Sequence, residues 1–283
     1  MTFWSGLAAH YRRVFPPRPE VVAWLAGLAR SAAPEGVARP AVVDLGCGVG
    51  DDAAGLAAAG LEVLALDPDA GMVAEARRLH AGVGGLVLDL AGLEDAAAAL
   101  ERWRSGGTRA GGEEVPVGVG SSDGQERGQE HGPALALCVG NVAAHLTLDA
   151  LAAALADLRP RLAPGGRLVL QTVNFDRVLA AGGAAGRFDL PLLEDPPRDD
   201  LPALRFERAY EDLTPSACRF VTRLEADGEV VAAGDVPMVP HRAAPLAAAV
   251  EAAGFGSVEL RGSLGEAPWE PTGTGPTVVL ARV

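Results

Sequence analysis

Apolar and polar positions along the chain fall into two alternating patterns. Short, largely apolar runs that are typical of buried strands occupy residues 41–45, 61–67, 84–90, 134–140 and 166–174. Stretches with apolar residues at helical spacing lie beside or between them, at residues 20–31, 51–60, 69–80, 93–103 and 148–162. Strands that alternate with helices in this way favour βαβ units and a parallel sheet. The pattern predicts an α/β fold with a doubly wound, mostly parallel, Rossmann-like sheet.

The pattern changes after residue 175. Residues 188–197 carry paired prolines and are typical of a loop. Runs within residues 204–237 alternate apolar and polar side chains, and Asp227-Gly228 separates two of them. Such a dipeptide between alternating runs favours a tight hairpin turn. We expect a small antiparallel β extension over residues 176–239.

The remaining segments complete the sheet and divide the chain. A helix at 244–254 and strands at 255–262 and 277–283 predict an antiparallel terminal hairpin, which brings the sheet to seven strands. Residues 104–132 are rich in Gly and lack aromatic side chains, so burial cannot offset their ordering entropy; a flexible insertion is expected, with an active-site lid as the alternative. The expected divisions are an N-terminal helical lid at 1–33, the Rossmann-like domain at 34–175 and 240–283, and the β extension at 176–239.

Composition and charge narrow the range of functions. The 283 residues include 37 Asp and Glu against 24 Arg, with no Lys and no Ile, and the net charge is −13. The missing Lys and Ile are typical of a GC-rich coding sequence. An acidic chain without basic clusters rarely grips a phosphate backbone, so a nucleic-acid partner is not expected. Cys47, Cys138 and Cys218 lack the spacing of a metal site or a disulfide framework, so no metal is predicted.

The N-terminal residues and the apolar stretches bear on export and membrane insertion. The N-terminal residues lack the charged start and apolar run of a signal peptide. The longest apolar stretches are rich in Ala and are interrupted by charged residues or Gly, so none is typical of a membrane span. We expect a soluble cytoplasmic protein, and the sequence leaves the oligomeric state open.

The most informative segment is the first strand–turn–helix, which reads DLGCGVGDD from Asp44 to Asp52. Glycines at such a turn let a ligand approach the backbone. The spacing is GxGxG rather than the GxGxxG of dinucleotide binders. Asp51 and Asp52 stand at the positive end of the following helix, where they would repel the pyrophosphate of a dinucleotide. This combination favours a nucleoside cofactor without phosphate, preferably a cation such as S-adenosylmethionine.

Acidic residues close the next two strands as well. Asp67 ends the second strand, where a carboxylate can accept hydrogen bonds from both ribose hydroxyls. Asp89-Leu90 ends the third strand, where a carboxylate can accept from an adenine amino group while the adjacent backbone reads the ring. Each Asp alone could equally be a turn or cap residue. Three of them on consecutive strand ends favour a cofactor at the carboxyl edge of the sheet.

These motifs together resemble a known family. DLGCGVG at 44–50, LALDP at 64–68, VLDL at 87–90 and LRPRLAPGGRLVL at 158–170 resemble the class I S-adenosylmethionine-dependent methyltransferases. WLAGLAR at 24–30 and GNVAAHL at 140–146 are similar to the glycine and sarcosine N-methyltransferase-like small-molecule group. The resemblance implies an enzyme that moves a methyl group from S-adenosylmethionine to nitrogen or oxygen of a small-molecule acceptor by in-line displacement.

The resemblance also implies roles for individual residues. Arg30 matches the Arg that pairs with the methionyl carboxylate, and Tyr11 matches an aromatic residue on an N-terminal lid. The residues expected to hold the cofactor are Arg30, Asp44, Gly46, Cys47, Gly48, Gly50, Asp67, Pro68, Met72, Asp89, Leu90, Val139 and Gly140. The residues expected to act in catalysis, at the boundary between cofactor and acceptor, are His145, Asn141 and Tyr11.

Several alternatives stay open at this point. His145 is either a general base or a packing residue, and Asn141 either binds substrate or serves a turn. Val173 stands where glycine-specific enzymes have a carboxylate-binding Arg, for which Arg177 or Arg242 could substitute. His241 and Arg242 are expected in a solvated loop. The rival functions are a nicotinamide-dependent oxidoreductase, a non-catalytic S-adenosylmethionine-binding regulatory protein, and methylation of a protein or tRNA.

Overall fold

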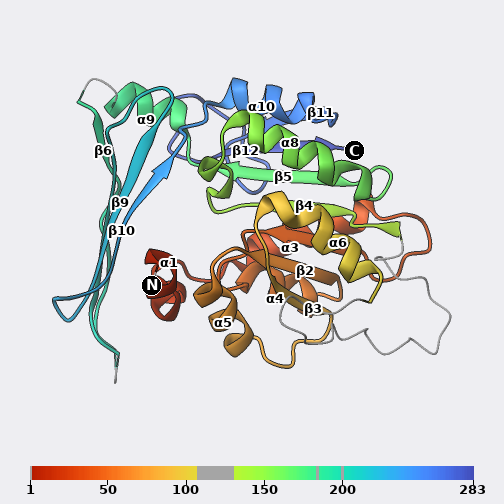
Figure 1. Cartoon of the computed structure of the whole chain (residues 1–283), viewed down its shortest axis with the longest axis horizontal. Coiled ribbons are helices and arrows are strands. Elements are labelled where there is room, and N and C mark those ends of the chain that lie inside the picture. Colours follow the sequence, from red (N-terminus) through yellow and green to blue (C-terminus); the bar gives the residue numbers. More distant parts are fainter. Residues whose placement is uncertain (1, 107–130, 183–184, 199–200) are drawn as a thin grey trace.

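A seven-stranded sheet forms the centre of the molecule in a computed structural model of the chain (Figure 1), which describes residues 2–106, 131–182, 185–198 and 201–283. Most of the expected insertion at 104–132 lies outside these residues. The strand order is β11-β12-β5-β4-β1-β2-β3, with β1 to β5 parallel and β12 antiparallel to both β5 and β11. The expected sheet with its terminal hairpin is therefore confirmed. Its strands are β1 (Ala41–Leu45), β2 (Glu62–Asp67), β3 (Leu86–Leu90), β4 (Leu135–Cys138), β5 (Arg167–Thr172), β11 (Gly256–Arg261) and β12 (Thr277–Arg282).

Helices cover both faces of this sheet, because its central strands are apolar on each side. All residues of β1 and β2 are buried, as expected of parallel strands between two helical layers. One apolar cluster joins the sheet to α6 (Ala96–Arg104), α8 (Leu148–Leu158) and α10 (Ala243–Ala252). A second cluster joins the other face to α3 (Pro19–Ala32), α4 (Asp51–Ala58) and α5 (Ala70–Leu79). Among the described residues, no helix combines the length and apolar character needed to cross a bilayer.

A second, antiparallel sheet forms the β extension, which stands at one end of the molecule (Figure 1). Asp227 and Gly228 both have positive φ (49° and 83°), the backbone that a two-residue hairpin turn requires. The expectation of a loop over 188–197 was incomplete, because short strands on either side of Pro191 pair with β8. The elements after β5 are α9 (Phe175–Gly182), β6 (Arg187–Asp189), β7 (Leu193–Asp195), β8 (Leu204–Glu211), β9 (Cys218–Ala226) and β10 (Glu229–Met238).

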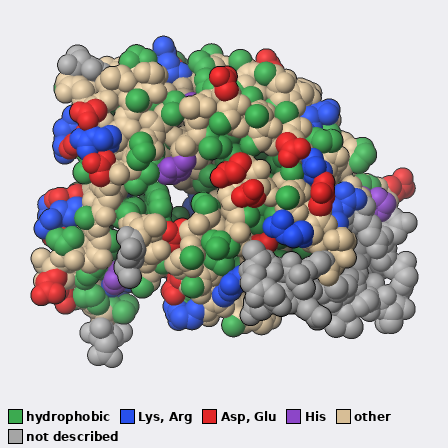
Figure 2. All heavy atoms as spheres, viewed as in Figure 1, with side chains coloured by type: hydrophobic (Ala, Val, Ile, Leu, Met, Phe, Trp, Pro, Cys, Tyr) green, Lys and Arg blue, Asp and Glu red, His purple; other side chains and the backbone are tan. Residues whose placement is uncertain are grey.

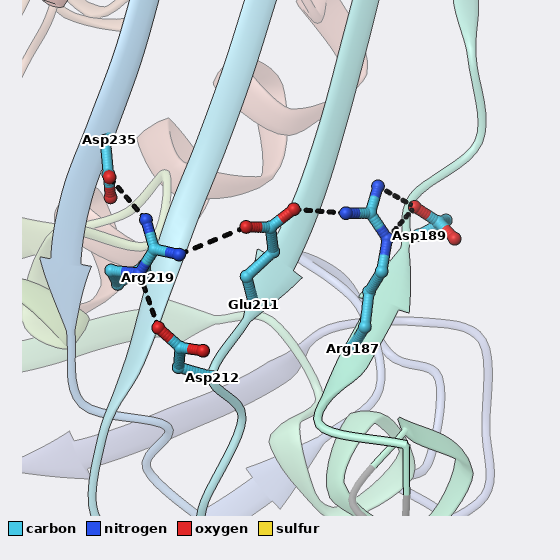
Figure 3. Close-up of polar contacts among 6 residues, drawn as sticks. All are labelled: Arg187, Asp189, Glu211, Asp212, Arg219 and Asp235. Atoms are coloured by element: carbon cyan, nitrogen blue, oxygen red, sulfur yellow. Dashed lines mark hydrogen bonds and ion pairs between the residues drawn. The ribbon is translucent and has the colours of Figure 1, made fainter.

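Charged side chains alternate in sign across the outer face of the extension (Figure 3). Glu211 on β8 lies between Arg219 on β9 and Arg187 on β6, and it pairs with both. Arg219 also contacts Asp212 at 2.7 Å, and Asp235 on β10. Exposed pairs of this kind contribute about 0–1 kcal/mol each, so we assign them to strand register rather than to stability.

The N-terminal segment fills the space between the two sheets (Figure 1). It consists of α1 (Phe3–Leu7), the 3₁₀ turn η1 (Ala8–His10) and α2 (Tyr11–Val14). Its apolar residues form one cluster with Met72 of α5 on the side of the main sheet and Phe206 of the extension on the other. The segment therefore connects the Rossmann-like sheet to the extension through a shared core.

Candidate active site

The turn after β1 adopts the conformation that its glycines make possible. Gly46, Gly48 and Gly50 all have positive φ (79°, 57° and 76°), so a side chain at any of them would be strained. The N–H groups of Gly46 and Cys47 donate to the carbonyl of Leu66 on β2, at 2.7 and 2.9 Å. The turn is thereby fixed across the carboxyl ends of β1 and β2, directly before α4 begins.

Asp67 ties the second strand to this turn. Its carboxylate accepts the N–H of Gly48 at 2.8 Å and the N–H of Asp69 at 2.9 Å. Burial raises the pKa of Asp67 to about 6, although these two backbone donors pull it down. A carboxylate held by two N–H groups keeps further lone pairs for hydroxyl donors.

Asp44 is the most perturbed carboxyl of the site. It is buried at the end of β1, and within the described part of the chain its Oδ1 has no hydrogen-bond partner. Burial raises the pKa of Asp44 to about 8, and the charges of Asp52 and Asp67 raise it further. A buried carboxyl without a donor is costly, and a cation placed against it would relieve that cost. Burial also raises the pKa of the Cys47 thiol well above its ordinary value, so Cys47 is an inert neighbour rather than a nucleophile.

The third strand contributes the expected pair at its end. Asp89 is buried, accepts the N–H of Leu90 at 2.9 Å and lies 3.5 Å from a guanidinium nitrogen of Arg102. Leu90 leaves 43% of its surface exposed, which makes it one of the few exposed large apolar residues in the described chain. Pro68 is exposed and Met72 is buried beneath the same edge. The exposed Leu can pack against an apolar ring, and the buried acid can accept a hydrogen bond from an amino group on that ring.

Two arginines pair with the acids at the start of α4. Asp51 lies 3.2 Å from Arg12, and Asp52 pairs with Arg18 at the start of α3. Arg12 belongs to the N-terminal segment, and Arg18 lies where that segment joins α3. The pair therefore anchors that segment as well as opposing an anion at the helix end.

The structure corrects the role expected of Arg30. Arg18 at the start of α3 meets Asp52 at the start of α4, so the two helices run in the same direction. Arg30, in the last turn of α3, is exposed and donates to the carbonyl of Ala59 at the far end of α4. A full helix length separates it from the glycine turn. Arg18, which the sequence reasoning missed, is the cation near Asp44.

The N-terminal segment is held on its cofactor side by polar contacts and close packing. Thr2 and Ser5 both donate to the carboxylate of Asp69, which also caps α5, and the Ser5 bond is 2.8 Å. A Cβ on Gly71 would lie 2.7 Å from Cα and Cβ of Ser5, so only Gly allows this approach. The ring of Tyr11 lies against Gly48: a Cβ added to Gly48 would lie 3.5 Å from the Cζ atom of Tyr11. Burial raises the pKa of Tyr11 to about 12, so its hydroxyl is a donor and not a base.

The other side of the same segment packs against the extension. A Cβ on Gly234 of β10 would lie 2.6 Å from the ring of Phe3, and one on Gly6 would lie 3.1 Å from Cβ of Ala232. Arg13 donates to Asp195 of β7 at 2.7 Å, while its neighbour Arg12 points to Asp51. Of the helical lid expected at 1–33, residues 3–14 lie between the two sheets, whereas α3 packs on the main sheet.

The turn after β4 brings the expected acceptor residues to the same edge. The 3₁₀ turn η3 (Val142–His145) begins at Asn141, which has a φ of 70°. Gly46 faces Val142 so closely that a Cβ there would lie 2.8 Å from its Cγ1. The side chain of Asn141 accepts the N–H of Val173 at 3.1 Å and donates to the sulfur of Met238 at 3.5 Å. These contacts support the turn interpretation of Asn141 rather than a catalytic one.

Val139 and Gly140 lead into η3. Val139 is buried in the cluster under α3, and Gly140 is exposed with its N–H donated to Gln171 at 2.8 Å. The Gly140 contact fixes the turn against the end of β5, while the backbone of Gly140 stays exposed. Gly140 can be approached by a ligand, whereas Val139 serves the core.

His145 lies at the end of η3 and contacts the N-terminal segment. Its ring meets the indole of Trp4 at a centroid distance of 6.0 Å and an interplanar angle of 76°. The residue is exposed, yet burial by surrounding atoms lowers the pKa of its imidazole. Both observations fit a ring that lines a concave surface. Figure 2 shows a hollow between the extension and the main sheet. The lowered pKa favours the unprotonated imidazole of His145.

The expectation of a solvated loop at His241 is wrong. His241 is buried, and its Nε2 lies 3.1 Å from the carbonyl of Ala143 and 2.9 Å from that of Leu146. Arg242 pairs with Asp176 at 2.8 Å, which also caps α10. A lone His after a β run gives no indication of such a role, because its partners are about a hundred residues away.

The residues that could replace the missing carboxylate-binding Arg are engaged elsewhere. Arg177 lies over the ring of Phe188 at 5.4 Å, and Arg242 is paired with Asp176. Val173 gives its N–H to Asn141. Neither arginine is therefore positioned as the expected substitute.

Known proteins resemble this chain in structure but not in sequence. No protein-family model matches the chain, and no curated protein matches it by sequence. The chain is similar in structure to the CcbJ methyltransferase from Streptomyces caelestis (TM-score 0.65, 18% identity, 100% of this chain and 98% of that one). It is also similar to CalS10, an amino pentose methyltransferase from Micromonospora echinaspora involved in calicheamicin biosynthesis (0.62, 19%, 97% and 94%). A third is the sugar N-methyltransferase KedS8 from Streptoalloteichus sp (0.61, 14%, 97% and 91%).

These similarities extend over almost the whole of each chain, including the β extension. The fold is that of the S-adenosylmethionine-dependent methyltransferases, as the sequence motifs predicted. In this chain, the region that the similarities cover contains the seven-stranded sheet, the glycine turn after β1 and the extension between β5 and α10.

Proposed function

We propose that this protein is a methyltransferase that uses S-adenosylmethionine to methylate an amine on a small molecule. The observation that carries the proposal is the buried carboxyl of Asp44 beside the glycine turn, whose Oδ1 has no hydrogen-bond partner among the described residues. S-adenosylmethionine brings an α-ammonium and a sulfonium, both cationic, and has no phosphate to meet the acids of α4. Nicotinamide dinucleotides would bring a pyrophosphate to Asp51 and Asp52.

Each strand end is assigned to a different part of the cofactor. Asp44 meets the α-ammonium, and Arg18 rather than Arg30 is the nearby cation for the methionyl carboxylate. Asp67 accepts from the ribose hydroxyls, and Asp89 with Leu90 holds the adenine. Tyr11 covers the glycine turn from the N-terminal segment.

When bound, S-adenosylmethionine supplies an activated methyl group: a nitrogen–carbon bond forms as the carbon–sulfur bond breaks, and the electron pair stays on sulfur. The protein's own part is to align the acceptor and exclude water. The acceptor amine must first lose its proton. His145 is assigned as the group that takes it, because it lies exposed at the end of η3, its ring packs against Trp4, and burial lowers its pKa.

The acceptor class is inferred from the arginines that could meet a carboxylate. An amino acid would bring a carboxylate, and the two arginines proposed to receive it are held by Phe188 and Asp176. An amine on a neutral ring needs no such partner. CalS10 and KedS8, which share the fold, act on an amino pentose and on a sugar nitrogen according to their names. We therefore propose an amino sugar as the acceptor and nitrogen as the methylated atom.

Calorimetry and a turnover screen test the proposal together. S-adenosylmethionine and S-adenosylhomocysteine are expected to bind to the wild-type protein, and NADH is not. Asp44→Asn should weaken S-adenosylmethionine by about 10- to 100-fold, since one charge-assisted contact is lost. S-adenosylhomocysteine release is then measured with an amino sugar, glycine and a phenol. Turnover should be at least about 100-fold higher with the amino sugar than with glycine.

Three results would contradict parts of this proposal. Binding of NADH alone would exclude the cofactor assignment and favour an oxidoreductase. Cofactor binding without turnover on any acceptor would favour a regulatory protein. Turnover with glycine equal to that with the amino sugar would exclude the acceptor assignment while leaving the reaction intact.

A further inference from the structure

The turn that presents His145 is held from outside the main sheet. The segment after β10 supplies two donors to it: the N–H of Val239 donates to Ala144 at 2.7 Å, and His241 reaches the carbonyls of Ala143 and Leu146. These three carbonyls lie on both sides of His145. The His241 contacts are thus side-chain bonds to the backbone of η3 and of the residue that follows His145.

The partners of His241 show that its Nε2 carries a proton. Both partners of Nε2 are carbonyl oxygens, which only accept, so Nε2 carries the proton and shares it between them. The side chain is only 2% exposed, and burial lowers the pKa of His241 while the two carbonyls oppose that shift. The charged groups next to it on α10 and α9 are Arg242 and Asp176, which pair with each other. His241 is therefore a buried donor held between two carbonyl groups.

We infer that His241 is the positioning residue of His145: it clamps the backbone of η3 on both sides of His145 and thereby sets the direction of the catalytic imidazole. This inference rests on the proposed function, in which His145 receives the proton of the acceptor amine. It also assigns a use to the extension, because the clamp belongs to the segment in which β10 returns to the main sheet. A shift of about 1 Å in a catalytic group can reduce a rate by about 100-fold, so such a clamp is worth retaining.

The test compares His241→Phe, which keeps a ring but no donor, with His241→Gln, whose amide can still donate to a carbonyl. His241→Phe is expected to lower kcat for the amino sugar by about 10- to 100-fold. Its KM and its affinity for S-adenosylhomocysteine should stay within about threefold, because neither pocket is touched. His241→Gln should recover most of the lost kcat. Val250→Ala, which opens a cavity under α10 away from η3, controls for reduced stability.

A second readout does not depend on turnover. The imidazole of His145 is titrated by NMR with labelled histidine, its resonance being assigned by its loss in His145→Gln. In the wild type its pKa should lie below the ordinary 6.5. In His241→Phe it should move toward that value, and the acidic limb of the kcat profile should move with it. His241→Gln should titrate like the wild type.

The outcomes separate the two proposals. If the wild type turns over and His241→Phe matches it in kcat and in the His145 titration, the positioning role is excluded. A loss of kcat that Val250→Ala reproduces would exclude it too. If the wild type shows no turnover at all, the proposed function fails, and the NMR titration alone decides whether His241 orients His145. Should His241→Phe not fold, His241→Asn, whose shorter amide reaches at most one carbonyl, takes its place with the same expectations.

Discussion

The indole of Trp4 meets the imidazole of His145 edge to face, with centroids 6.0 Å apart and planes at 76°. Trp4 belongs to the first helix of the chain, and His145 belongs to the turn after β4. The same helix is fixed to Asp69 on the cofactor side through Thr2 and Ser5. One short helix therefore contacts both the cofactor edge and the residue assigned to catalysis.

Trp4→Ala is expected to weaken the acceptor rather than the cofactor. Loss of an aromatic wall beside His145 should raise KM for the amino sugar by about tenfold, corresponding to about 1.4 kcal/mol. Affinity for S-adenosylhomocysteine should change by less than about threefold. Trp24→Phe, which alters an indole on α3, is the matched control. Steady-state kinetics and calorimetry measure the two effects, and an unchanged KM would show that Trp4 only packs.

The raised pKa of Asp44 predicts how stability depends on pH. The folded protein holds this proton to about pH 8, whereas the unfolded chain releases it near 3.8. The stabilisation is therefore complete below 3.8, shrinks as the pH rises, and is lost above about 8. Without cofactor, Tm should fall between pH 6 and 9, by the equivalent of about 2 kcal/mol. Asp44→Asn should show a smaller fall, and equal slopes in thermal scans would contradict the assignment.

The same carboxyl should link cofactor binding to protons. The cation is bound by ionised Asp44, so the affinity for S-adenosylmethionine should rise with pH up to about 8. Binding at pH 7 should release a proton, which calorimetry in buffers of different ionisation enthalpy detects. In Asp44→Asn that proton release should be absent. An affinity that does not change with pH would place the cation elsewhere.

Gly71 is expected to be essential for docking of the N-terminal helix. A Cβ at this position would lie 2.7 Å from Cα and Cβ of Ser5, and part of that contact is with backbone. Gly71→Ala should therefore displace α1, at a cost of about 1–3 kcal/mol, and expose the N-terminal segment to protease. Gly27→Ala, which meets nothing within 4 Å on helix α3, should be neutral or stabilising. Equal cleavage rates in the two variants would argue against close docking.

Arg18 and Arg30 provide a direct test of geometry against motif. Arg18→Gln should weaken S-adenosylmethionine by about tenfold, because Arg18 is the cation near Asp44 and Asp52. Arg30→Gln should leave the affinity within about twofold, because Arg30 lies at the opposite end of α4. Calorimetry with both variants decides the matter. A loss confined to Arg30→Gln would restore the role that the motif implied.

Local sequence was sufficient for features that depend on neighbouring residues. The spacing Gly46, Gly48, Gly50 predicted a ligand-binding turn because each position needs a backbone that only Gly adopts freely. The hairpin at Asp227-Gly228 followed for the same reason. In contrast, α9 and the strands on either side of Pro191 were missed, because the short strands are stabilised by pairing with β8 rather than by their own pattern.

The site shows the same division. The sequence by itself determined the mostly parallel sheet with its terminal hairpin and the acids that close its strands, since parallel strands bring their carboxyl ends to one edge. Only the tertiary structure decided which arginine lies at that edge, because Arg18 and Arg30 sit on the same helix and differ in which end faces the turn. It also decided that His241 is buried under η3 and that Arg12 and Arg18 pair with the acids of α4. These contacts join residues far apart in the chain, and their energies depend on distances that periodicity and composition do not encode.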